Sequence, residues 1–486
     1  MLNERFAKMI KYVQYLFLWL QSIFQRFGSW ISFLLEDKQP DSKKNTIAVL
    51  DGVRGVAVLM VMVFHINRMT GDNLWSRVKY PLATSISTAG GTGVTLFFVL
   101  SGFLLFMPFA KALLNKTRWP LARVFYMRRA LRIIPAYYVS LFVIIVFNHP
   151  EYLHRDHLKD LFLFVTFFMD STRATFRQIN GPFWTLATEW QFYMLLPLIC
   201  LAIAFIVSRV PVQRRLRAVS FCILGVIALG LFVRFWGLYF LNHPSQTFLV
   251  SRSQLDVVMF FTFGITGKYT EDFAIGMLIS LLYIYSQNPS TGGKLAQNWQ
   301  RYSQWLWGVG IVVLVFGAMW HFNHEMQGWP FLNPLLPVWD WLNEFLLALG
   351  FGVCIAAILY GSSGLRRMFA WKPLRWVGLI SFSLYMWHLP LLVLFQTRLL
   401  PLFHISNRYV SYSLLWLWAL LIVFPIAFLS YLIIEKPWMK LGDRWRLLIE
   451  KNHQEELERQ EAAAARQQEA IEQRNTSAVP QEVVTK

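Results

Sequence analysis

Long apolar runs separated by short polar segments dominate the chain. Ten of these runs are long enough, or nearly so, to cross the roughly 30 Å hydrocarbon core of a bilayer as helices. They lie near residues 48–68, 91–110, 131–147, 183–207, 218–240, 271–287, 304–322, 341–361, 376–399 and 409–434. The pattern predicts an all-α polytopic membrane protein with about ten transmembrane helices.

Four other segments complete this division of the chain. Residues 158–169 are apolar but short, which fits a half-span or an interfacial helix. Residues 1–47 form an N-terminal cytoplasmic or interfacial segment, in which 11–35 alternate polar and aromatic positions at helical spacing. That spacing predicts a helix lying in the interface, with a spanning helix as the alternative. A membrane domain then covers 48–442, and the charged, alanine-rich tail 443–486 is predicted as helix passing into disorder.

The basic residues between the apolar runs predict the orientation of the protein. If the N-terminus is cytoplasmic, most loop lysines and arginines fall on the cytoplasmic side, and loop 323–340 on the other side has none. Loop 148–182 is the exception, because its four basic residues are accompanied by four acidic ones. We therefore expect both termini in the cytoplasm and the protein in the cytoplasmic (inner or plasma) membrane.

Composition narrows the class of protein further. Of the 486 residues, 56% are hydrophobic and 15% are charged, against roughly 25% charged in soluble domains. The net charge of +19 is interpreted as topology and attraction to anionic membrane lipids, not as nucleic-acid binding. The three cysteines lie inside apolar runs without metal-binding or disulfide spacing, so we expect no metal site: they are Cys200, Cys222 and Cys354.

The first predicted span carries three ionisable residues on one helical stripe. In "LDGVRGVAVLMVMVFH" (50–65), Asp51 and Arg54 are three positions apart and Arg54 and His65 are eleven apart. Eleven residues make three turns plus about 20°, with a rise of about 16 Å. Intramembrane ionisable groups are costly and usually face a bundle interior or a wet cavity. The stripe therefore predicts either a buried ion pair with a packed histidine or, as we favour, a catalytic path.

This stretch resembles the first-helix signature of the acyltransferase-3 membrane family, in which an arginine precedes a histidine by eleven positions. Further stretches resemble other motifs of that family in the same order, and the resemblance covers about 46–442. They are "FFVLSGFLL" (97–105), "RRALRIIPAYY" (128–138), "FWTLATEWQFYMLLP" (183–197), "ISFSLYMWHLPLL" (380–392) and "IEKPWMKLG" (434–442). The family moves acyl groups, most often acetyl from acetyl-CoA, onto hydroxyls of extracytoplasmic carbohydrates and related molecules.

The resemblance implies catalytic roles for four residues. Arg54 and His65 correspond to the family's functional pair, and Glu189 matches the acidic residue of the W-T-L block. His65 is expected to deprotonate the acceptor hydroxyl or to carry the acyl group covalently. Arg54, paired with Asp51, would orient the donor or stabilise negative charge. Glu189 needs a partner inside the membrane, and Arg54 or His65 is the candidate.

The arginines that enter the third predicted span have two interpretations of equal weight. Arg128, Arg129 and Arg132 either anchor the topology or bind the phosphates of acyl-CoA, the expected donor substrate. No tightly bound cofactor is expected.

Three further residues are candidates with weaker support. Ser101 could be a nucleophile, but no G-x-S-x-G elbow surrounds it and close helix packing of the Ser101–Gly102 pair is favoured. Tyr385 and His388 lie in an aromatic block. His388 could carry a second proton, although a packed, hydrogen-bonded histidine is favoured.

These observations predict a membrane O-acyltransferase that moves an acyl group from cytoplasmic acyl-CoA to an extracytoplasmic carbohydrate or glycolipid. The charged tail could bind a partner protein. Some family members add a C-terminal hydrolase-like domain, whereas about 45 residues follow the last motif here, too few for a domain. We expect the membrane part to act alone or with a separate protein. The alternative is a transporter or flippase of an envelope precursor, although no duplicated halves are found.

Overall fold

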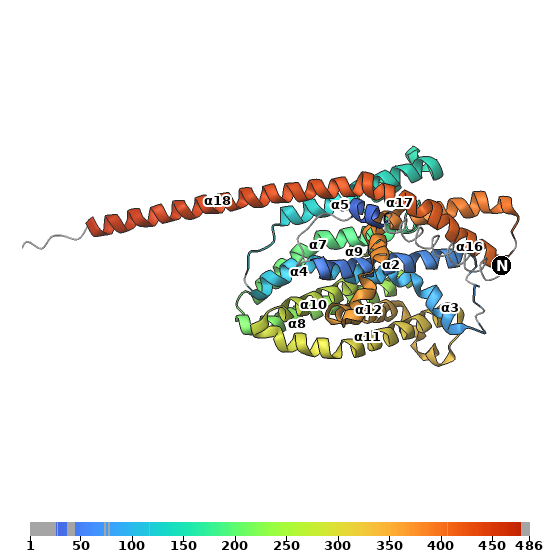
Figure 1. Cartoon of the computed structure of the whole chain (residues 1–486), viewed down its shortest axis with the longest axis horizontal. Coiled ribbons are helices and arrows are strands. Elements are labelled where there is room, and N and C mark those ends of the chain that lie inside the picture. The colour runs from blue at the N-terminus through green and yellow to red at the C-terminus, as the bar shows by residue number, and fades with distance from the viewer. Residues whose placement is uncertain are drawn as a thin grey trace, which may run out of the picture.

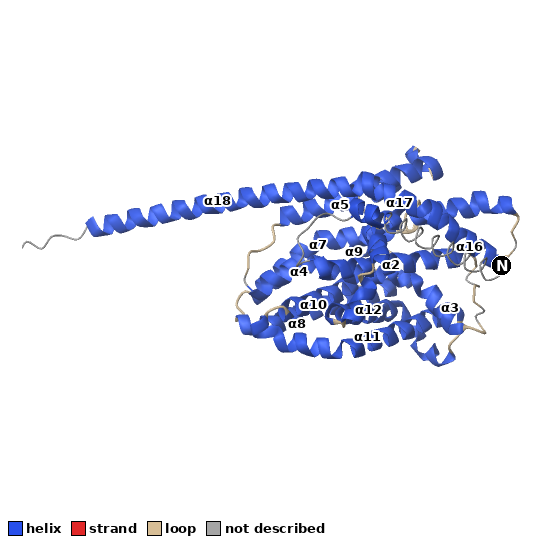
Figure 2. Cartoon of the chain, in the orientation of Figure 1, coloured by secondary structure: helices blue, strands red, loops and turns tan. Residues whose placement is uncertain are grey.

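The computed structural model describes residues 26, 28–35, 44–71, 74–75, 78–115, 117–405 and 407–477. Within these ranges all regular structure is helical and no strand occurs (Figure 2), which confirms the all-α prediction. Of the predicted interfacial helix, 11–35, only Arg26 and 28–35 are described, and they are helical. The rest of that segment and the last residues of the tail lie outside the described residues.

Nine helical stretches in the described part of the chain are long and apolar enough to cross a membrane. They coincide with nine of the ten predicted runs and comprise Ala48–Met69, Pro81–Asn115, Ala122–Asn148, Phe183–Val207, Val212–Asn242, Gly292–Met326, Pro330–Tyr360, Ser381–Phe403 and Arg408–Ala470. The remaining predicted run, 271–287, forms the shorter helix α10 (Thr270–Ser286) of 17 residues. The sequence therefore located every long helix of the bundle.

The individual helices fall into two groups. The long ones are α2 (Lys44–Met69), α4 (Gly93–Asn115), α5 (Ala122–Asn148), α7 (Phe183–Val207), α8 (Arg215–Asn242), α11 (Pro289–Met326), α12 (Trp339–Tyr360), α15 (Ser381–Leu394) and α18 (Lys436–Ser477). Shorter helices connect or extend them: α3 (Pro81–Thr88), α6 (Leu158–Val165), α9 (Arg252–Thr262), α13 (Ser363–Phe369), α14 (Lys372–Leu379), α16 (Arg408–Trp418) and α17 (Phe424–Ser430). The apolar segment 158–169 thus contributes only the eight-residue helix α6.

Helix α2 runs through the middle of the bundle, between α4 and the α14–α15 pair (Figure 1). Helix α4 packs along α10 on its other side, and the contact is close because Gly102 has no side chain. A Cβ at Gly102 would lie 2.0 Å from the carbonyl oxygen of Phe273 on α10. This glycine contact fixes the rotation of α4, so Ser101, about 100° around the helix from Gly102, faces away from α10 and reaches Glu189 of α7.

The outer surface of the bundle is apolar. Phe205, Phe147 and Phe221 are 82%, 78% and 72% exposed, respectively. Aromatic side chains in such positions would be an aggregation hazard in water but are stable against lipid tails. Together with the long apolar helices, this surface identifies an integral membrane protein.

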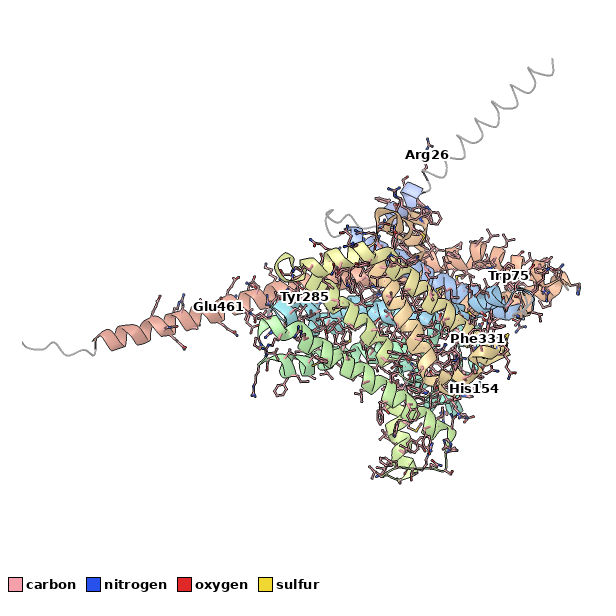
Figure 3. The ribbon with its side chains drawn as sticks, turned by 90° about the horizontal axis from the view of Figure 1, so that it is seen from below. Arg26, Trp75, His154, Tyr285, Phe331 and Glu461 are labelled. Atoms are coloured by element: carbon pink, nitrogen blue, oxygen red, sulfur yellow. The ribbon has the colours of Figure 1, made fainter. Side chains whose placement is uncertain are left out.

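The loops separate into two ends of the bundle. Figure 3 shows Trp75, His154 and Phe331 at one end, and Tyr285 and Glu461 toward the other. Helix α18 runs alongside α5 and extends beyond the bundle at this second end (Figure 1). Loops 148–182 and 323–340, which were predicted to share a side, therefore do so, while the side that faces the cytoplasm stays a prediction.

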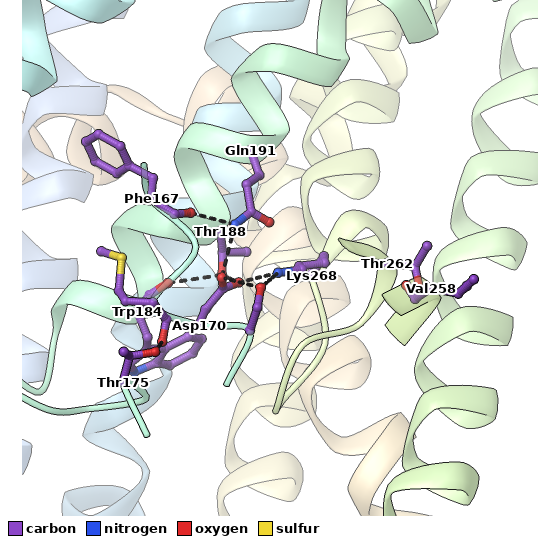
Figure 4. A network of polar contacts seen from close by, with 11 residues as sticks. Phe167, Asp170, Thr175, Trp184, Thr188, Gln191, Val258, Thr262 and Lys268 are labelled. Atoms are coloured by element: carbon purple, nitrogen blue, oxygen red, sulfur yellow. Dashed lines mark hydrogen bonds and ion pairs between the residues drawn. The ribbon is translucent and has the colours of Figure 1, made fainter. Parts of the chain in front are cut away.

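A fully paired polar network holds the loop between α6 and α7 against the α9–α10 connection (Figure 4). The Lys268 ammonium group lies 2.6 Å from an Asp170 carboxylate oxygen, and the two side chains are 12% and 3% exposed. Gln191 of α7 donates to the other Asp170 oxygen at 3.0 Å and to the carbonyl of Phe167 at 2.7 Å. Burial lowers the pKa of Lys268 and the Asp170 carboxylate opposes that shift.

Candidate active site

Helices α2, α4, α5, α7 and α15 surround a cavity, which we call the arginine chamber, with an empty volume of about 720 Å³ that includes its open side. Apolar residues of α4 form much of its wall. Its charged lining residues are Arg54, Arg129, Arg132 and Glu189, and the hydroxyl groups of Ser101 and Tyr193 lie beside Glu189. Three helices, α2, α5 and α7, thus bring one carboxylate and three guanidinium groups to the same space.

The N-terminal part of the α2 stripe lies at this chamber. The Arg54 guanidinium is 3.3 Å from an Asp51 carboxylate oxygen, so the predicted pairing is confirmed. Asp51 is almost buried, whereas Arg54 remains 22% exposed and lines the cavity. Asp51 therefore holds the guanidinium in place, and Arg54 is the member of the pair that a ligand in the chamber would contact.

Glu189 has different partners from those expected. Ser101 Oγ of α4 donates a hydrogen bond to Glu189 Oε1 at 2.6 Å, and the phenol of Tyr193 donates to the same oxygen. No hydrogen bond or ion pair joins Glu189 to Arg54 or His65 within the described residues. Sequence reasoning did not single out Tyr193, although a tyrosine four positions after a helical glutamate lies on the same face.

The three arginines of α5 do not form one cluster. Arg128 pairs with Asp443 of α18 at 3.1 Å. It lies at a second cavity of about 1430 Å³, the basic mouth, whose charged lining residues are Lys111, Arg118, Arg128, Arg129, Arg446 and Glu450. Arg132 lines the arginine chamber but not the basic mouth, while Arg129 lines both cavities. The arginines therefore extend from the mouth inward, and Arg129 is the point where the two cavities meet.

The C-terminal part of the α2 stripe opens to a third cavity of about 1180 Å³, the histidine chamber. Its ionisable lining residues include His65, Arg68, Arg177, Tyr269, His321, Glu325 and Glu344. His388, which is fully buried, contacts His65 from α15. Arg54 and His65 share a helix face as predicted, but they belong to two different cavities.

The hydrogen bonds of the two histidines define their neutral tautomers. His388 Nδ1 lies 2.9 Å and 3.1 Å from the carbonyl oxygens of Tyr385 and Leu384, and a carbonyl can only accept, so Nδ1 carries the proton. His388 Nε2 is then an acceptor, 3.3 Å from His65 Nδ1. His65 Nδ1 is also 2.9 Å from the carbonyl of Val61. Both contacts require a proton on His65 Nδ1, which leaves His65 Nε2 as the basic nitrogen.

The two chambers share a thin boundary made by Val94, Thr185 and Tyr385. Thr185 Oγ1 and the Tyr385 phenol are 2.7 Å apart. Both hydroxyls also reach the carbonyl oxygen of Pro182, Thr185 at 2.9 Å and Tyr385 at 3.4 Å, so either hydroxyl can donate to the other. This contact, which we call the hydroxyl partition, joins α7 to α15. Tyr385 was a sequence candidate, whereas Thr185 was not.

Comparison with known proteins gives matches over nearly the same residues as the predicted membrane domain, 48–442. A family model described as an acyltransferase domain matches residues 47–435. A peptidoglycan O-acetyltransferase (OatA) of Listeria monocytogenes is 27% identical over 81% of this chain and 56% of its own length. A putative peptidoglycan O-acetyltransferase (YrhL) of Bacillus subtilis is 25% identical over 81% of this chain and 55% of its own length. An O-acetyltransferase (OatA) of Staphylococcus aureus is 23% identical over 81% and 57%.

The chain therefore spans a little over half the length of these curated relatives. No solved structure matches it.

Proposed function

The chain belongs to the acyltransferase-3 family, and from that premise we propose that it transfers an acyl group, most simply acetyl, from acyl-CoA to a hydroxyl of a carbohydrate or glycolipid acceptor. One observation carries the proposal: the basic mouth, the arginine chamber and the histidine chamber lie in series. The first two share Arg129, and the last two share the hydroxyl partition. The relatives named as peptidoglycan O-acetyltransferases support acetyl as the group and peptidoglycan as an acceptor.

On the donor side, the phosphates of acyl-CoA would bind the basic mouth. Guanidinium groups make bidentate hydrogen bonds to phosphate. Arg129 suits this role better than Arg128, because Arg128 already pairs with Asp443. The thioester would then extend into the arginine chamber, where Arg54 stabilises the negative charge that develops on its carbonyl oxygen.

On the acceptor side, a sugar would occupy the histidine chamber. Glu325 and Glu344 line this cavity and can accept hydrogen bonds from sugar hydroxyls, while His65 Nε2 can take the proton of the reacting hydroxyl. The arrangement supports a cytoplasmic donor and an extracytoplasmic acceptor, since the basic mouth is lined by Arg446 near the start of α18 and by the α4–α5 connection, whose basic residues predict a cytoplasmic side. We place the protein in the cytoplasmic membrane on the same grounds.

The test is acyl transfer from labelled acetyl-CoA to cell-envelope glycans in membranes that contain His65→Ala or Arg54→Ala. We expect each variant to lose about 10²- to 10⁴-fold in rate, as removal of a general acid–base group does. His154→Ala, an exposed histidine in a distant loop, is the matched control. Full transfer by a stably inserted His65→Ala variant would contradict the proposed role of His65.

The closed hydroxyl partition between two polar cavities also fits a transporter that opens to one side at a time. The two functions differ in donor consumption. An acyltransferase releases one CoA thiol for each acyl group transferred, whereas a transporter moves its substrate intact and consumes no acetyl-CoA. Measuring thiol release with purified protein decides between them.

A further inference from the structure

We propose that Ser101 is a covalent acyl carrier in the arginine chamber and that Glu189 is the base that activates it. The inference rests on the proposed acyl transfer and adds an acyl-enzyme intermediate to it. Nucleophilic catalysis by serine requires a base within hydrogen-bond reach, a group that orients the base, and donors for the oxyanion. All three surround Ser101.

The local packing of α4 aims Ser101 at the cavity. Gly102, the next residue, faces α10, where a Cβ would lie 2.0 Å from the carbonyl oxygen of Phe273. Successive residues on a helix are about 100° apart, so Ser101 turns away from that contact and lines the chamber. Gly102 therefore makes the close helix contact that was expected of the Ser101–Gly102 pair, while Ser101 faces the chamber, where it can act as a nucleophile.

The base is held in a fixed position. Glu189 Oε1 accepts from Ser101 Oγ at 2.6 Å and from the phenol of Tyr193. Tyr193 is itself buried, with the Arg129 guanidinium 6.0 Å from the centroid of its ring. Serine, glutamate and tyrosine thus repeat the order of nucleophile, base and orienting group.

Donors for the oxyanion line the same space. Arg129 and Arg132 have no hydrogen-bonded partner among the described residues, and each guanidinium offers five N–H donors. Arg54 adds a third guanidinium, anchored by Asp51. A hydrogen bond that served only to satisfy Glu189 would not require three cationic side chains around the serine. Their charge matches the oxyanion that forms on the thioester carbonyl oxygen when Ser101 attacks.

The proposed transfer has two steps. In the first, Ser101 Oγ attacks the thioester carbonyl, Glu189 takes the hydroxyl proton, the C–S bond breaks, and Glu189 returns the proton to the departing sulfur. The products are an acyl ester on Ser101 and the free CoA thiol. In the second, the acceptor hydroxyl attacks this ester, its proton replaces the acyl group on Ser101 Oγ, and the acylated acceptor leaves. No oxidant or additional reactant is needed.

The hydroxyl partition explains why an acyl ester on Ser101 would help the transfer. Acyl-CoA reaches the arginine chamber from the basic mouth, whereas the acceptor occupies the histidine chamber on the other side of the Thr185–Tyr385 contact. An acyl ester on Ser101 stays behind when CoA dissociates. Only a small acyl group then has to meet the acceptor when the partition opens.

The experiment is a single-turnover labelling of the full-length protein in lipid nanodiscs with radiolabelled acetyl-CoA and no acceptor. Samples are quenched rapidly, and peptides are mapped by mass spectrometry. We expect one acetyl group on the peptide that contains Ser101, released CoA thiol in equal amount, and discharge of the label when peptidoglycan fragments are added.

Variants locate the label. Ser101→Ala should remove both the label and transfer to the acceptor, while Ser101→Cys should form a thioester that hydroxylamine cleaves. The matched control is Ser140→Ala, because Ser140 is a buried serine that bonds only to the Tyr137 carbonyl of its own helix. It should label and transfer as the unmodified protein does.

The outcomes separate the inference from the proposed function. If CoA is released and the acceptor is acylated but Ser101→Ala retains full transfer, or if the label sits on His65 or Tyr193, Ser101 is not the carrier and the acyltransferase function stands. If no CoA is released with any acceptor while Ser140→Ala and the unmodified protein remain folded, the proposed function itself fails.

Discussion

Two buried polar clusters of this bundle each combine a carboxylate with cationic side chains but differ in what those side chains face. Around Asp170, a carboxylate, an ammonium group and an amide bond to one another and fill the space between α7 and the α9–α10 connection. Around Glu189, the carboxylate bonds only to hydroxyls among the described residues, and the guanidinium groups line the arginine chamber. The first cluster stabilises a loop. The second cluster holds charged side chains where a ligand can contact them, and burying these charges lowers the stability of the protein.

The comparison is tested most strongly by Glu189→Gln. The amide can still accept hydrogen bonds from Ser101 and Tyr193, but it cannot take a proton. We expect acyl transfer to fall by about 10²- to 10⁴-fold, while the midpoint of detergent-induced unfolding stays the same. A large loss of stability with little loss of rate would assign this cluster a structural role instead.

The next largest effect is expected at Lys268→Met, which leaves the buried Asp170 carboxylate without its cation. Breaking a buried pair in this way costs about 3–5 kcal/mol of unfolding free energy. Replacing both residues by apolar ones should recover much of that loss. Unfolding curves of the single and double variants measure it. Equal stability of Lys268→Met and the unmodified protein would show that the network does not support the fold.

A smaller effect on donor binding, separate from the loss of rate that follows if these guanidinium groups hold the oxyanion, is expected when Arg129 and Arg132 are both replaced by alanine. Hydrogen bonds to charged groups contribute about 1.5–3 kcal/mol each, so the KM for acetyl-CoA should rise by about tenfold or more with little change in stability. The rise should shrink at high salt, because screening already weakens the phosphate contacts of the unmodified protein. An unchanged KM at low salt would return these arginines to a topological role.

The smallest effect is expected at Tyr385→Phe, which removes the phenol hydrogen bond to Thr185 and keeps the ring. One neutral hydrogen bond contributes about 0.5–1.5 kcal/mol. We expect a few-fold increase in acetyl-CoA hydrolysis that is not coupled to acceptor acylation, because water enters the arginine chamber more often. Thiol release measured with and without acceptor gives the ratio, and an unchanged ratio would show that the partition does not control access.

Sequence periodicity located the helices and the Asp51–Arg54 contact, because both depend on residues within one or two turns. The same reasoning placed Arg54 and His65 on one face of α2. It could not show that this face crosses a boundary between two cavities, because the boundary is made by Thr185 and Tyr385, which are far apart in the chain. Local spacing carries no signal for such a contact.

The surroundings of Glu189 illustrate the same limit. Its partner within the helix, Tyr193, was available from the spacing of the two residues in α7. Its other partner, Ser101, reaches it from α4, and that approach depends on the rotation set by Gly102 against α10. The resemblance to a family marked Glu189 as important, but only the packing of three helices shows which hydroxyls it binds.

The hydroxyl partition also has a consequence for the transmembrane potential of the cell. A continuous wet passage from the basic mouth to the far side of the histidine chamber would conduct protons or small anions and short-circuit the transmembrane potential. Thr185 and Tyr385 interrupt that passage with two neutral groups bonded at 2.7 Å, beside the apolar Val94. In the proposed mechanism an uncharged acetyl group passes from Ser101 to the acceptor across this barrier without an accompanying ion. The chemistry can therefore span the bilayer while the bilayer remains an insulator.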